Sequence, residues 1–343
     1  MVLRLIGYLR VVFRDGTLDL ERNWRRLVGI VRKTVKRFIP QSLMDWRWRR
    51  ARYKMAGAAG LTLVERDICF DLMKGERTLR IRSSHAIYLE HMIENFDYYV
   101  DSVVPIRTDG KLLVDMSGPR YHRLKGFSDL PFLFPSHTEP YRTTEEYLEF
   151  ADLTEGKVVL DIGAYSGVTS IIFAQLVGKN GHVFAFEADE LNYECARQNV
   201  EMAKLWMGLD NITLIPKAVW SHSNGILFSH EGAMGSSAVA ITGGGRGAEK
   251  RVPSTTLEDI CLEKRLDRVD FIKVDIEGGE AEMLEHSVNF LARMKTRLIV
   301  EPHLVGETMT TERCSNLLAK AGYKVRIREQ VGESAPLIEA ESL

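Results

Sequence analysis

Cysteine is scarce in this chain. The 343 residues include four cysteines, and no two of them form a Cys-x-x-Cys pair. This scatter argues against a structural zinc site and against a disulfide framework, and it suits a reducing compartment such as the cytoplasm. Each cysteine is expected to pack as a small apolar side chain. The four are Cys69, Cys195, Cys261 and Cys314.

Long apolar runs and internal repeats are also absent. No stretch reaches the roughly 18 apolar residues that a membrane-spanning helix requires, so none is expected. The first apolar segment is interrupted by Arg4 and Arg10 and has no evident cleavage site, so no secretory signal is expected. With 45% hydrophobic and 27% charged residues, the chain is neither collagenous, coiled-coil nor globally disordered. A globular protein of about two domains is the expectation.

Net charge is close to zero, but it is unevenly distributed. Residues 1–56 hold 15 basic and four acidic side chains, which gives this segment a net charge of +11. Because the whole chain has a net charge of −1, residues 57–343 have a net charge of −12. Within this basic segment, apolar residues recur at spacings of three and four, which predicts an amphipathic helix ending near Pro40. We expect it to lie on an anionic membrane surface or to pack on protein. Nucleic-acid binding is a weaker alternative, since no helix-turn-helix or metal-finger pattern accompanies the charge. The apolar positions are Trp24, Leu27, Val28, Val31, Val35 and Phe38.

Residues 57–140 are expected to form a mixed α/β region. A helix is predicted over 90–100 and a strand over 111–116. The proline-rich stretch 121–140, which includes Ser136-His137-Thr138, forms either a cover over an active site or an irregular surface connection. We therefore divide the chain into a basic helical segment (1–56), a mixed region (57–140), a main domain (141–330) and a C-terminal tail (331–343).

Strands and helices alternate regularly in the main domain. Its first helix is predicted to open at Thr143-Thr144, with a capping hydroxyl and acids in the first turn. The alternation predicts an α/β fold with a doubly wound, mostly parallel sheet, preceded by a helical and mixed N-terminal extension. Ligands of such sheets bind beyond the carboxyl ends of the strands. Strands are predicted over 158–162, 183–186, 212–215, 271–274 and 298–300, and helices over 168–177, 190–206 and 279–293.

The turn after the first strand lacks two common nucleotide motifs. After Gly163 the next glycine is Gly167, so the dinucleotide pattern GxGxxG is absent, and no GK[ST] follows either. A turn headed by Asp161 instead suits a ligand with a cationic amino-acid end. The second strand ends in Glu187, where a carboxylate can accept hydrogen bonds from both hydroxyls of a ribose. The two acids together indicate S-adenosylmethionine.

Five motifs carry a resemblance to a known family. The chain resembles the FkbM-type methyltransferases, a branch of the Rossmann-like S-adenosylmethionine-dependent enzymes, over roughly residues 135–328. The segment around KVDIEGGE is the most specific of the five. The motifs are VVLDIGAYSGVTS (158–170), VFAFEA (183–188), TTLEDI (255–260), FIKVDIEGGEAEML (271–284) and IVEPH (299–303).

The resemblance implies S-adenosylmethionine as cofactor and places its contacts at the first two strand ends. The family usually has Asn where this chain has Tyr165, so an amide that could orient the turn is replaced by a phenol. The usual Pro after the second-strand Glu is Ala188. The predicted cofactor-binding residues are Asp161, Gly163, Ala164, Tyr165, Gly167 and Glu187.

The resemblance also implies methyl transfer to a hydroxyl. The catalytic candidates are Asp275 and Glu277 after the fourth strand and His303 after the fifth. A neutral imidazole can accept a hydroxyl proton, and carboxylates this close together should raise the pKa of at least one of them. The alternatives are that the acids bind sugar hydroxyls, that Glu280 caps the following helix, or that the acids hold a divalent cation. No metal is assigned.

The expected acceptor is a hydroxyl of a glycan or glycolipid, methylated in the cytoplasm, with the basic segment holding the enzyme at the inner membrane surface. A small-molecule hydroxyl or amine is one alternative acceptor, and a catalytically silent cofactor-binding scaffold is another reading. The glycine-rich stretch 229–250 forms either a mobile loop over the acceptor or a hairpin extension. The sequence does not indicate the oligomeric state.

Overall fold

The computed structural model describes residues 41–244, 247–332 and 335–342. The amphipathic helix predicted over 24–38 lies outside the described residues. The chain divides into two compact units, residues 1–54 and residues 55–343. Helix α3 (Gln41–Ala58) is the first described element. Among the residues that the structure describes, no helix combines the length and apolar character needed to span a membrane.

The second unit begins with a five-stranded sheet in the order β1-β2-β3-β5-β4. Two helices follow β3 where the sequence predicted one over 90–100. The break falls at Asn95, whose side-chain amide donates to the backbone oxygen of His91 and so competes with the helical pattern. The elements are β1 (Thr62–Glu65), β2 (Cys69–Lys74), β3 (Arg77–Arg82), η1 (Ser83–Tyr88), α4 (Leu89–Glu94), α5 (Phe96–Ser102), β4 (Ile106–Thr108) and β5 (Lys111–Met116).

A seven-stranded sheet, ordered β10-β9-β8-β16-β17-β21-β20, forms the centre of the main domain. The first five strands are parallel, and β21 runs antiparallel to both of its neighbours. All five strands expected from the sequence are present, which confirms the doubly wound α/β fold. They are β8 (Val158–Ile162), β9 (His182–Phe186), β10 (Ile212–Ile215), β16 (Phe271–Val274) and β17 (Arg297–Val300), followed by β20 (Tyr323–Arg328) and β21 (Leu337–Ser342).

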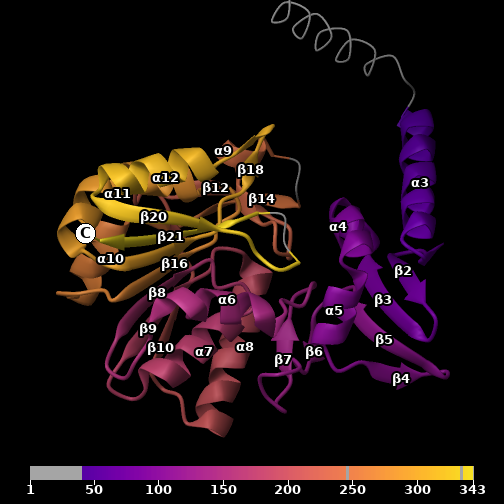
Figure 1. The fold of residues 1–343 in the computed structure, drawn as a ribbon, viewed down its shortest axis with the longest axis horizontal. Helices are drawn as coiled ribbons and strands as arrows, with labels where there is room; N and C mark the ends of the chain where they lie inside the picture. The colour runs from indigo at the N-terminus through magenta and orange to yellow at the C-terminus, as the bar shows by residue number, and fades with distance from the viewer. Residues whose placement is uncertain (1–40, 245–246, 333–334, 343) are drawn as a thin grey trace, which may run out of the picture. The chain divides into compact units, whose positions relative to one another are not determined.

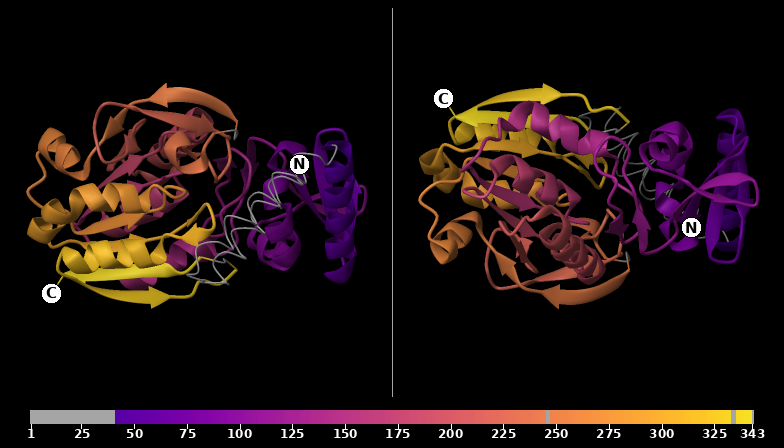
Figure 2. Two further views of the ribbon diagram at one scale, coloured as in Figure 1. Left: turned by 90° about the horizontal axis from the view of Figure 1, so that it is seen from above. Right: turned by 90° about the horizontal axis from the view of Figure 1, so that it is seen from below.

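Helices cover both faces of this sheet (Figure 1; Figure 2 views the molecule from above and from below). Side chains alternate along each strand, so Leu160 and Ile162 pack under one helical layer while Val159 packs under the other. The first layer holds α10 (Leu257–Lys264), α11 (Glu280–Met294) and α12 (Thr311–Lys320), and the second holds α6 (Tyr141–Ala151), α7 (Val168–Val177) and α8 (Glu190–Met207).

Helix α6 does not begin as the sequence predicted. It starts at Tyr141, with Pro140 at the cap position and no side-chain cap hydrogen bond. The hydroxyl expected to cap it, on Thr143, lies 3.0 Å from the Tyr98 hydroxyl, and the Thr144 hydroxyl lies 2.7 Å from that of Thr169. Both hydroxyls are therefore used in packing this helix against its neighbours, and the predicted cap is wrong.

The predicted C-terminal tail contains a central strand. Within residues 331–343, β21 inserts between β17 and β20. Its Glu339 is almost fully buried, because the guanidinium groups of Arg326 and Arg328 on β20 bind its two oxygens. An acid in the middle of the strand hid this element from the hydrophobic pattern.

The first sheet and the main domain share one apolar core. Side chains from β2, β3 and α5, such as Leu72, Ile81 and Val100, belong to the same cluster as Ile171 and Ile172 on α7. The boundary predicted at residue 140 therefore falls inside a single compact unit.

The glycine-rich stretch adopts the hairpin alternative. Strand β12 (Ile226–His230) pairs antiparallel with β14 (Ala248–Val252) and with β13 (Ser237–Ala238). Helix α9 (Val239–Thr242) lies between β13 and β14, while Gly245 is outside the described residues. The remaining short strands are β6 (Arg120–His122), β7 (Phe132–Phe134), β11 (Ala218–Val219), β15 (Ser254–Thr255), β18 (Leu304–Val305) and β19 (Thr308–Met309). All four cysteines are buried, as expected of small packed apolar side chains.

Candidate functional site

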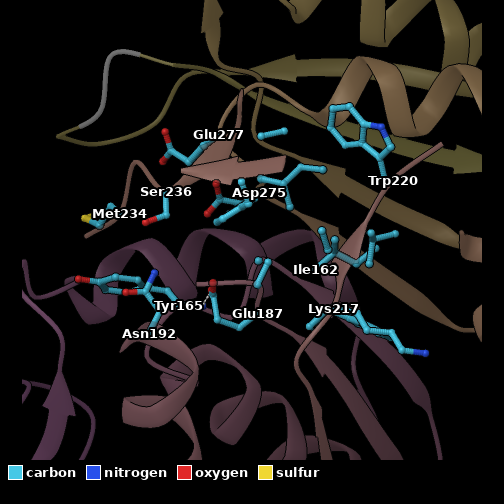
Figure 3. Close-up of a pocket in the computed structure, with 18 of the residues that line it drawn as sticks. Ile162, Tyr165, Glu187, Asn192, Lys217, Trp220, Met234, Ser236, Asp275 and Glu277 are labelled. Atoms are coloured by element: carbon cyan, nitrogen blue, oxygen red, sulfur yellow. Dashed lines mark hydrogen bonds between the residues drawn. The ribbon is translucent and has the colours of Figure 1, made fainter. Parts of the chain in front are cut away.

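A cavity of about 750 Å³, counting its open mouth, lies beyond the carboxyl ends of β8, β9 and β16. Figure 3 shows Lys217 and Trp220 at one end of it, and Tyr165, Met234 and Glu277 at the other. This is the edge of the sheet at which the sequence predicted a ligand. Three of the predicted cofactor-binding residues, Gly163, Tyr165 and Glu187, line the cavity.

Gly163 makes the first turn possible. Its φ is +85°, and a Cβ at this position would lie 1.7 Å from the backbone oxygen of Asp275. The amides of Gly163 and Ala164 both donate to the backbone oxygen of Phe186, at 3.0 and 2.9 Å. The turn is therefore clamped between β9 and β16, and only glycine fits where these backbones meet.

Tyr165 connects the turn to the segment before the main domain. It has a φ of 50°, and its hydroxyl donates to the backbone oxygen of His137 at 2.7 Å. Burial raises the pKa of this phenol well above its ordinary value, so it remains a hydrogen-bond donor. Ser136, His137 and Thr138 are themselves buried. The segment proposed as a cover is thus part of the protein interior beside the turn.

Glu187 is held by backbone amides at the tip of β9. One of its oxygens accepts from the Tyr165 amide at 2.8 Å, and the other from the Asp189 amide at 2.7 Å. Burial, reinforced by the nearby charge of Asp189, raises the pKa of Glu187 to about 8, although the two amides act in the opposite direction. A carboxylate fixed in this way keeps lone pairs for the two hydroxyls of a ribose.

This pKa gives a testable pH dependence. Because the ionised form of Glu187 accepts hydrogen bonds from ribose better than the protonated form, S-adenosylmethionine affinity should fall as the pH drops from 8 to 6. Because one proton is involved, the affinity can fall by at most about tenfold for each pH unit. Calorimetric Kd values across this range would measure the effect. The Glu187→Gln variant should bind S-adenosylmethionine weakly, and its Kd should depend less on pH. If the Kd of that variant changes with pH as steeply as in the wild type, another group is responsible for the titration.

Asp161 lies beneath the turn, outside the cavity wall. It is fully buried, accepts a hydrogen bond from Ser170 at 2.5 Å, and pairs with Lys273 Nζ at 3.5 Å. Burial raises its pKa, and Lys273 opposes that rise. Ala164 and Gly167 are also not among the residues that line the cavity. These three positions support the turn, and their contact with a cofactor stays a prediction.

Lys273 holds the turn from below, at the centre of a group of acids. Its Nζ donates to the backbone oxygen of Gly163 at 2.6 Å and lies 3.3 Å from Asp275 Oδ2. Burial lowers its pKa, but four surrounding carboxylates outweigh burial and raise the pKa above the ordinary lysine value, so the amine stays charged. The four belong to Asp275, Asp161, Glu139 and Glu301.

Sequence reasoning missed Glu139. This residue precedes α6 and lines the cavity with Gly163 and Lys273. Burial and the neighbouring acids raise its pKa to about 8, against the influence of Lys273. No local pattern around residue 139 signals a site. Glu139 reaches the cavity because it belongs to the segment that begins at Ser136, whose backbone is bound by the Tyr165 hydroxyl at His137.

The end of the cavity near Trp220 is apolar. Trp220, Phe228, Ile226 and Ala218 belong to one buried cluster and also line the wall. Trp220 and Phe228 therefore pack in the core and at the same time face the cavity. A flat apolar group such as a purine would be desolvated here, while polar parts of the same ligand would reach the acidic end.

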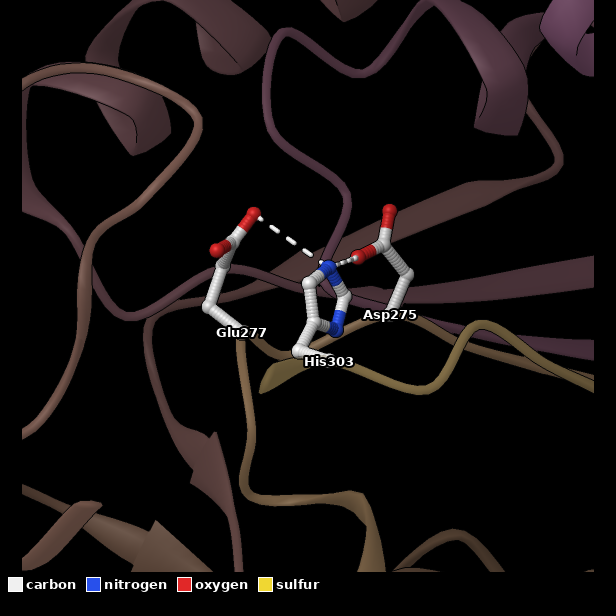
Figure 4. A group of neighbouring side chains, drawn as sticks. All are labelled: Asp275, Glu277 and His303. Atoms are coloured by element: carbon white, nitrogen blue, oxygen red, sulfur yellow. Dashed lines mark ion pairs between the residues drawn. The ribbon is translucent and has the colours of Figure 1, made fainter. Parts of the chain in front are cut away.

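The three catalytic candidates come together at the tips of β16 and β17. His303 Nε2 lies 3.6 Å from Asp275 Oδ1 and 3.5 Å from Glu277 Oε1. Figure 4 shows the two carboxylates on either side of the ring nitrogen. Asp275 and Glu277 also line the cavity. The prediction that acids after the fourth strand face a histidine after the fifth is therefore correct as geometry.

Glu280 orients this histidine. It is fully buried at the start of α11, and its Oε1 lies 2.9 Å from His303 Nδ1. The same oxygen accepts from the amides of Ile276 and Gly278, at 3.1 and 3.0 Å. Helix α11 has no side-chain cap hydrogen bond, and the Glu280 side chain instead closes the turn that precedes the helix.

The field of these carboxylates favours positive charge between them. Burial lowers the pKa of His303, but Glu277, Glu280 and Asp275 together raise it well above the ordinary histidine value. Burial also raises the pKa of Glu277 to about 8, against the influence of His303. Three potential ligand atoms, one from each of Asp275, Glu277 and His303, lie within 4.8 Å of one another, so this group could hold a metal ion.

Sequence comparison assigns a class to this domain. Residues 161–325 match the family described as the methyltransferase FkbM domain. The protein-L-isoaspartate O-methyltransferase of Methanosarcina mazei is 37% identical over 67 residues, which are 20% of this chain and 26% of that protein. The enzyme of the same name from Methanothermobacter thermautotrophicus is 36% identical over 67 residues, 20% of this chain and 29% of that protein. The chain thus spans under a third of these relatives.

Solved structures with this type of sheet include other methyltransferases. The methyltransferase FkbM of Methylobacillus flagellatus KT is 15% identical, with a TM-score of 0.41 over 57% of this chain and 50% of that one. A precorrin-6y C5,15-methyltransferase from Geobacter metallireducens is 18% identical, with a TM-score of 0.38 over 60% of this chain and 90% of that one.

The parallel sheet and the family match together define a Rossmann-like methyltransferase domain. More specifically, the chain carries a methyltransferase FkbM domain over residues 161–325, which confirms the family expected from the sequence. S-adenosylmethionine, also expected from the sequence, is the cofactor implied for this domain.

Proposed function

We propose that this protein transfers a methyl group from S-adenosylmethionine to a hydroxyl, in keeping with the O-methyltransferase names of its sequence relatives. The observation that carries the proposal is the arrangement of the cavity. It runs from an apolar pocket at Trp220, past the fixed carboxylate of Glu187, to Asp275 and Glu277, the two acids that lie beside His303.

The cavity wall matches the parts of the cofactor in order. The apolar end accommodates a purine, and Glu187 can accept from the ribose hydroxyls. Gly163 lines the cavity, so its backbone can face the amino-acid part. Glu139 and Asp275 add acidic groups to this part of the wall, beside the ammonium of Lys273, which pairs with both Asp161 and Asp275. Acids that outnumber this one ammonium suit the ammonium and sulfonium charges of the cofactor.

The acceptor would bind beside Asp275, Glu277 and His303. S-adenosylmethionine supplies an electrophilic methyl group, and the protein holds the acceptor oxygen in line and helps to remove its proton. Carboxylates that line the cavity can also accept hydrogen bonds from neighbouring hydroxyls, which favours a sugar as the acceptor. We therefore propose a glycan or glycolipid hydroxyl as substrate, with a small-molecule hydroxyl as the alternative.

Two substitutions test the acceptor side. His303→Ala and Glu277→Gln should each lower kcat by at least about tenfold, because each removes a group that acts on the acceptor hydroxyl. The Kd for S-adenosylmethionine should stay within about twofold. Turnover with labelled cofactor and calorimetry measure the two quantities. The matched control is Glu307→Gln, an exposed acid in the neighbouring β18–β19 turn. Unchanged turnover in both variants would remove these residues from the mechanism.

The proposed activity itself is tested in two stages. Calorimetry with S-adenosylmethionine should show binding, and its absence would contradict the proposal at once. Mass spectrometry of glycans and lipids from cells with and without the gene should then show species that differ by one CH₂ group. Binding without any such methylated product would favour the scaffold alternative. If purified protein methylates a soluble hydroxyl compound but no glycan, the alternative acceptor class is correct.

A further inference from the structure

The group formed by Asp275, Glu277 and His303 has the donor set of a metal site. It offers two carboxylate oxygens and one imidazole nitrogen, held by the tips of adjacent parallel strands. Two carboxylates balance the charge of a divalent ion, and oxygen with imidazole nitrogen suits first-row transition metals. Among the described residues this is the one group of its kind.

The histidine is oriented as metal-binding histidines usually are. Glu280 Oε1 already accepts two backbone amides, so it acts as an acceptor toward the ring as well. The Nδ1 atom therefore carries a proton toward Glu280, while Nε2 faces the two carboxylates and becomes a ligand when a cation displaces its proton. A buried carboxylate that fixes the far nitrogen of a ligand histidine is a recurrent feature of metal sites.

The separations fit a shared cation better than direct hydrogen bonds. The distances from Nε2 to Asp275 and Glu277, 3.6 and 3.5 Å, both exceed the 2.7–3.2 Å typical of an N–H···O bond. Two ligands on one ion with bonds of about 2.0–2.2 Å lie about 2.9–3.6 Å apart. Three potential ligand atoms thus lie within 4.8 Å of one another, close enough for one cation to bring them together.

We propose that Asp275, Glu277 and His303 bind one divalent transition-metal cation, which takes the acceptor hydroxyl as a further ligand. The binding site stands on its own geometry, whereas the role in catalysis rests on the proposed function. Asp275 and Glu277 line the cavity, so a cation between them faces the acceptor space. Three protein ligands leave coordination positions open for a substrate oxygen and water.

The cation would acidify the hydroxyl bound to it. Metal coordination can lower the pKa of bound water by several units, and an alcohol responds in the same direction. The hydroxyl proton would pass to solvent, and the metal-bound alkoxide oxygen would attack the methyl carbon. The new carbon–oxygen bond would form as the methyl–sulfur bond breaks, and its electron pair would leave with the sulfur of S-adenosylhomocysteine. The three side chains would then act as ligands, and His303 would not itself accept the proton.

The test uses full-length protein freed of metal with EDTA. Manganese binding is followed by the loss of the electron paramagnetic resonance signal of free Mn²⁺, and S-adenosylmethionine binding is measured in the same preparation. We expect one Mn²⁺ per chain. Asp275→Asn, Glu277→Gln and His303→Ala should each weaken Mn²⁺ binding at least tenfold, while Glu307→Gln should leave it unchanged. Methyl transfer should stop in EDTA and return with Mn²⁺.

Each contrary result has a distinct meaning. Wild-type protein that binds S-adenosylmethionine but neither Mn²⁺, Zn²⁺ nor Mg²⁺ at millimolar concentration overturns the metal site, without any reliance on folded variants. Mn²⁺ binding that survives all three substitutions places the ion elsewhere and also overturns it. Full turnover in EDTA overturns the catalytic role and returns His303 to the position of a base. Absent S-adenosylmethionine binding contradicts the proposed function and leaves the Mn²⁺ measurement valid.

Discussion

Replacing Gly163 with alanine is expected to reduce S-adenosylmethionine affinity at least about 100-fold, the cost that a misplacement of about 1 Å can have in an active site. The new Cβ would meet the backbone oxygen of Asp275 at 1.7 Å. This oxygen cannot rotate away as a side chain could, so the turn or the tip of β16 must shift. Calorimetric Kd values and thermal melting would measure the two consequences.

Gly156→Ala provides the matched control. Gly156 has a φ of +86°, against +85° for Gly163, but a Cβ there would meet no atom within 4 Å. Both variants therefore carry the same backbone strain, about 1–2 kcal/mol, and only one carries the clash. Similar losses of cofactor affinity in the two variants would show that the close approach to Asp275 does not matter.

Lys273→Met should destabilise the fold by about 3–5 kcal/mol, the usual cost of leaving buried charge unpaired. The substitution keeps most of the side-chain volume but removes the ammonium that pairs with Asp161 and Asp275 and binds the Gly163 backbone oxygen. Asp161 Oδ1 has no hydrogen-bond partner among the described residues, so it would face the interior with no compensating charge. Chemical denaturation at pH 7 measures the loss.

The pH dependence of this loss follows from the acids. Without Lys273 the pKa of Asp161, already raised by burial, rises further, so the folded variant retains a proton that the unfolded chain releases. The deficit relative to the wild type should therefore grow from pH 5 to pH 8. Lys217→Met is the control: this lysine also lines the cavity but pairs with the exposed Glu263, and its loss should cost no more than about 1 kcal/mol. A deficit of equal size in both variants would contradict the burial argument.

The sequence predicted the parallel part of the main sheet because its strands are short apolar runs between helical patterns. Val158–Ile162 is the clearest case, since both faces of the strand are buried. Strand β21 was missed because Glu339 interrupts its apolar pattern, and its partners Arg326 and Arg328 become neighbours only in the folded sheet. A single-sequence pattern carries no information about such cross-strand pairing.

For the site, the sequence predicted residues whose position follows from the end of a strand. Glu187, Asp275 and His303 all lie where the parallel register places them. The sequence did not predict the direction in which a side chain within the turn points. Asp161 points to Lys273 beneath the cavity, and Glu139 reaches the cavity through a segment whose path depends on tertiary contacts with Tyr165.

The apolar core shared by the first sheet and helix α7 has a practical consequence for anyone who wishes to excise the methyltransferase portion. A fragment beginning at residue 141 would lose both Glu139 and the side chains that cover Val168, Ile171 and Ile172. The uncovered surface would promote self-association, and the cavity would lack one of the acids that line it. Biochemical work on this family member should therefore retain the preceding strands.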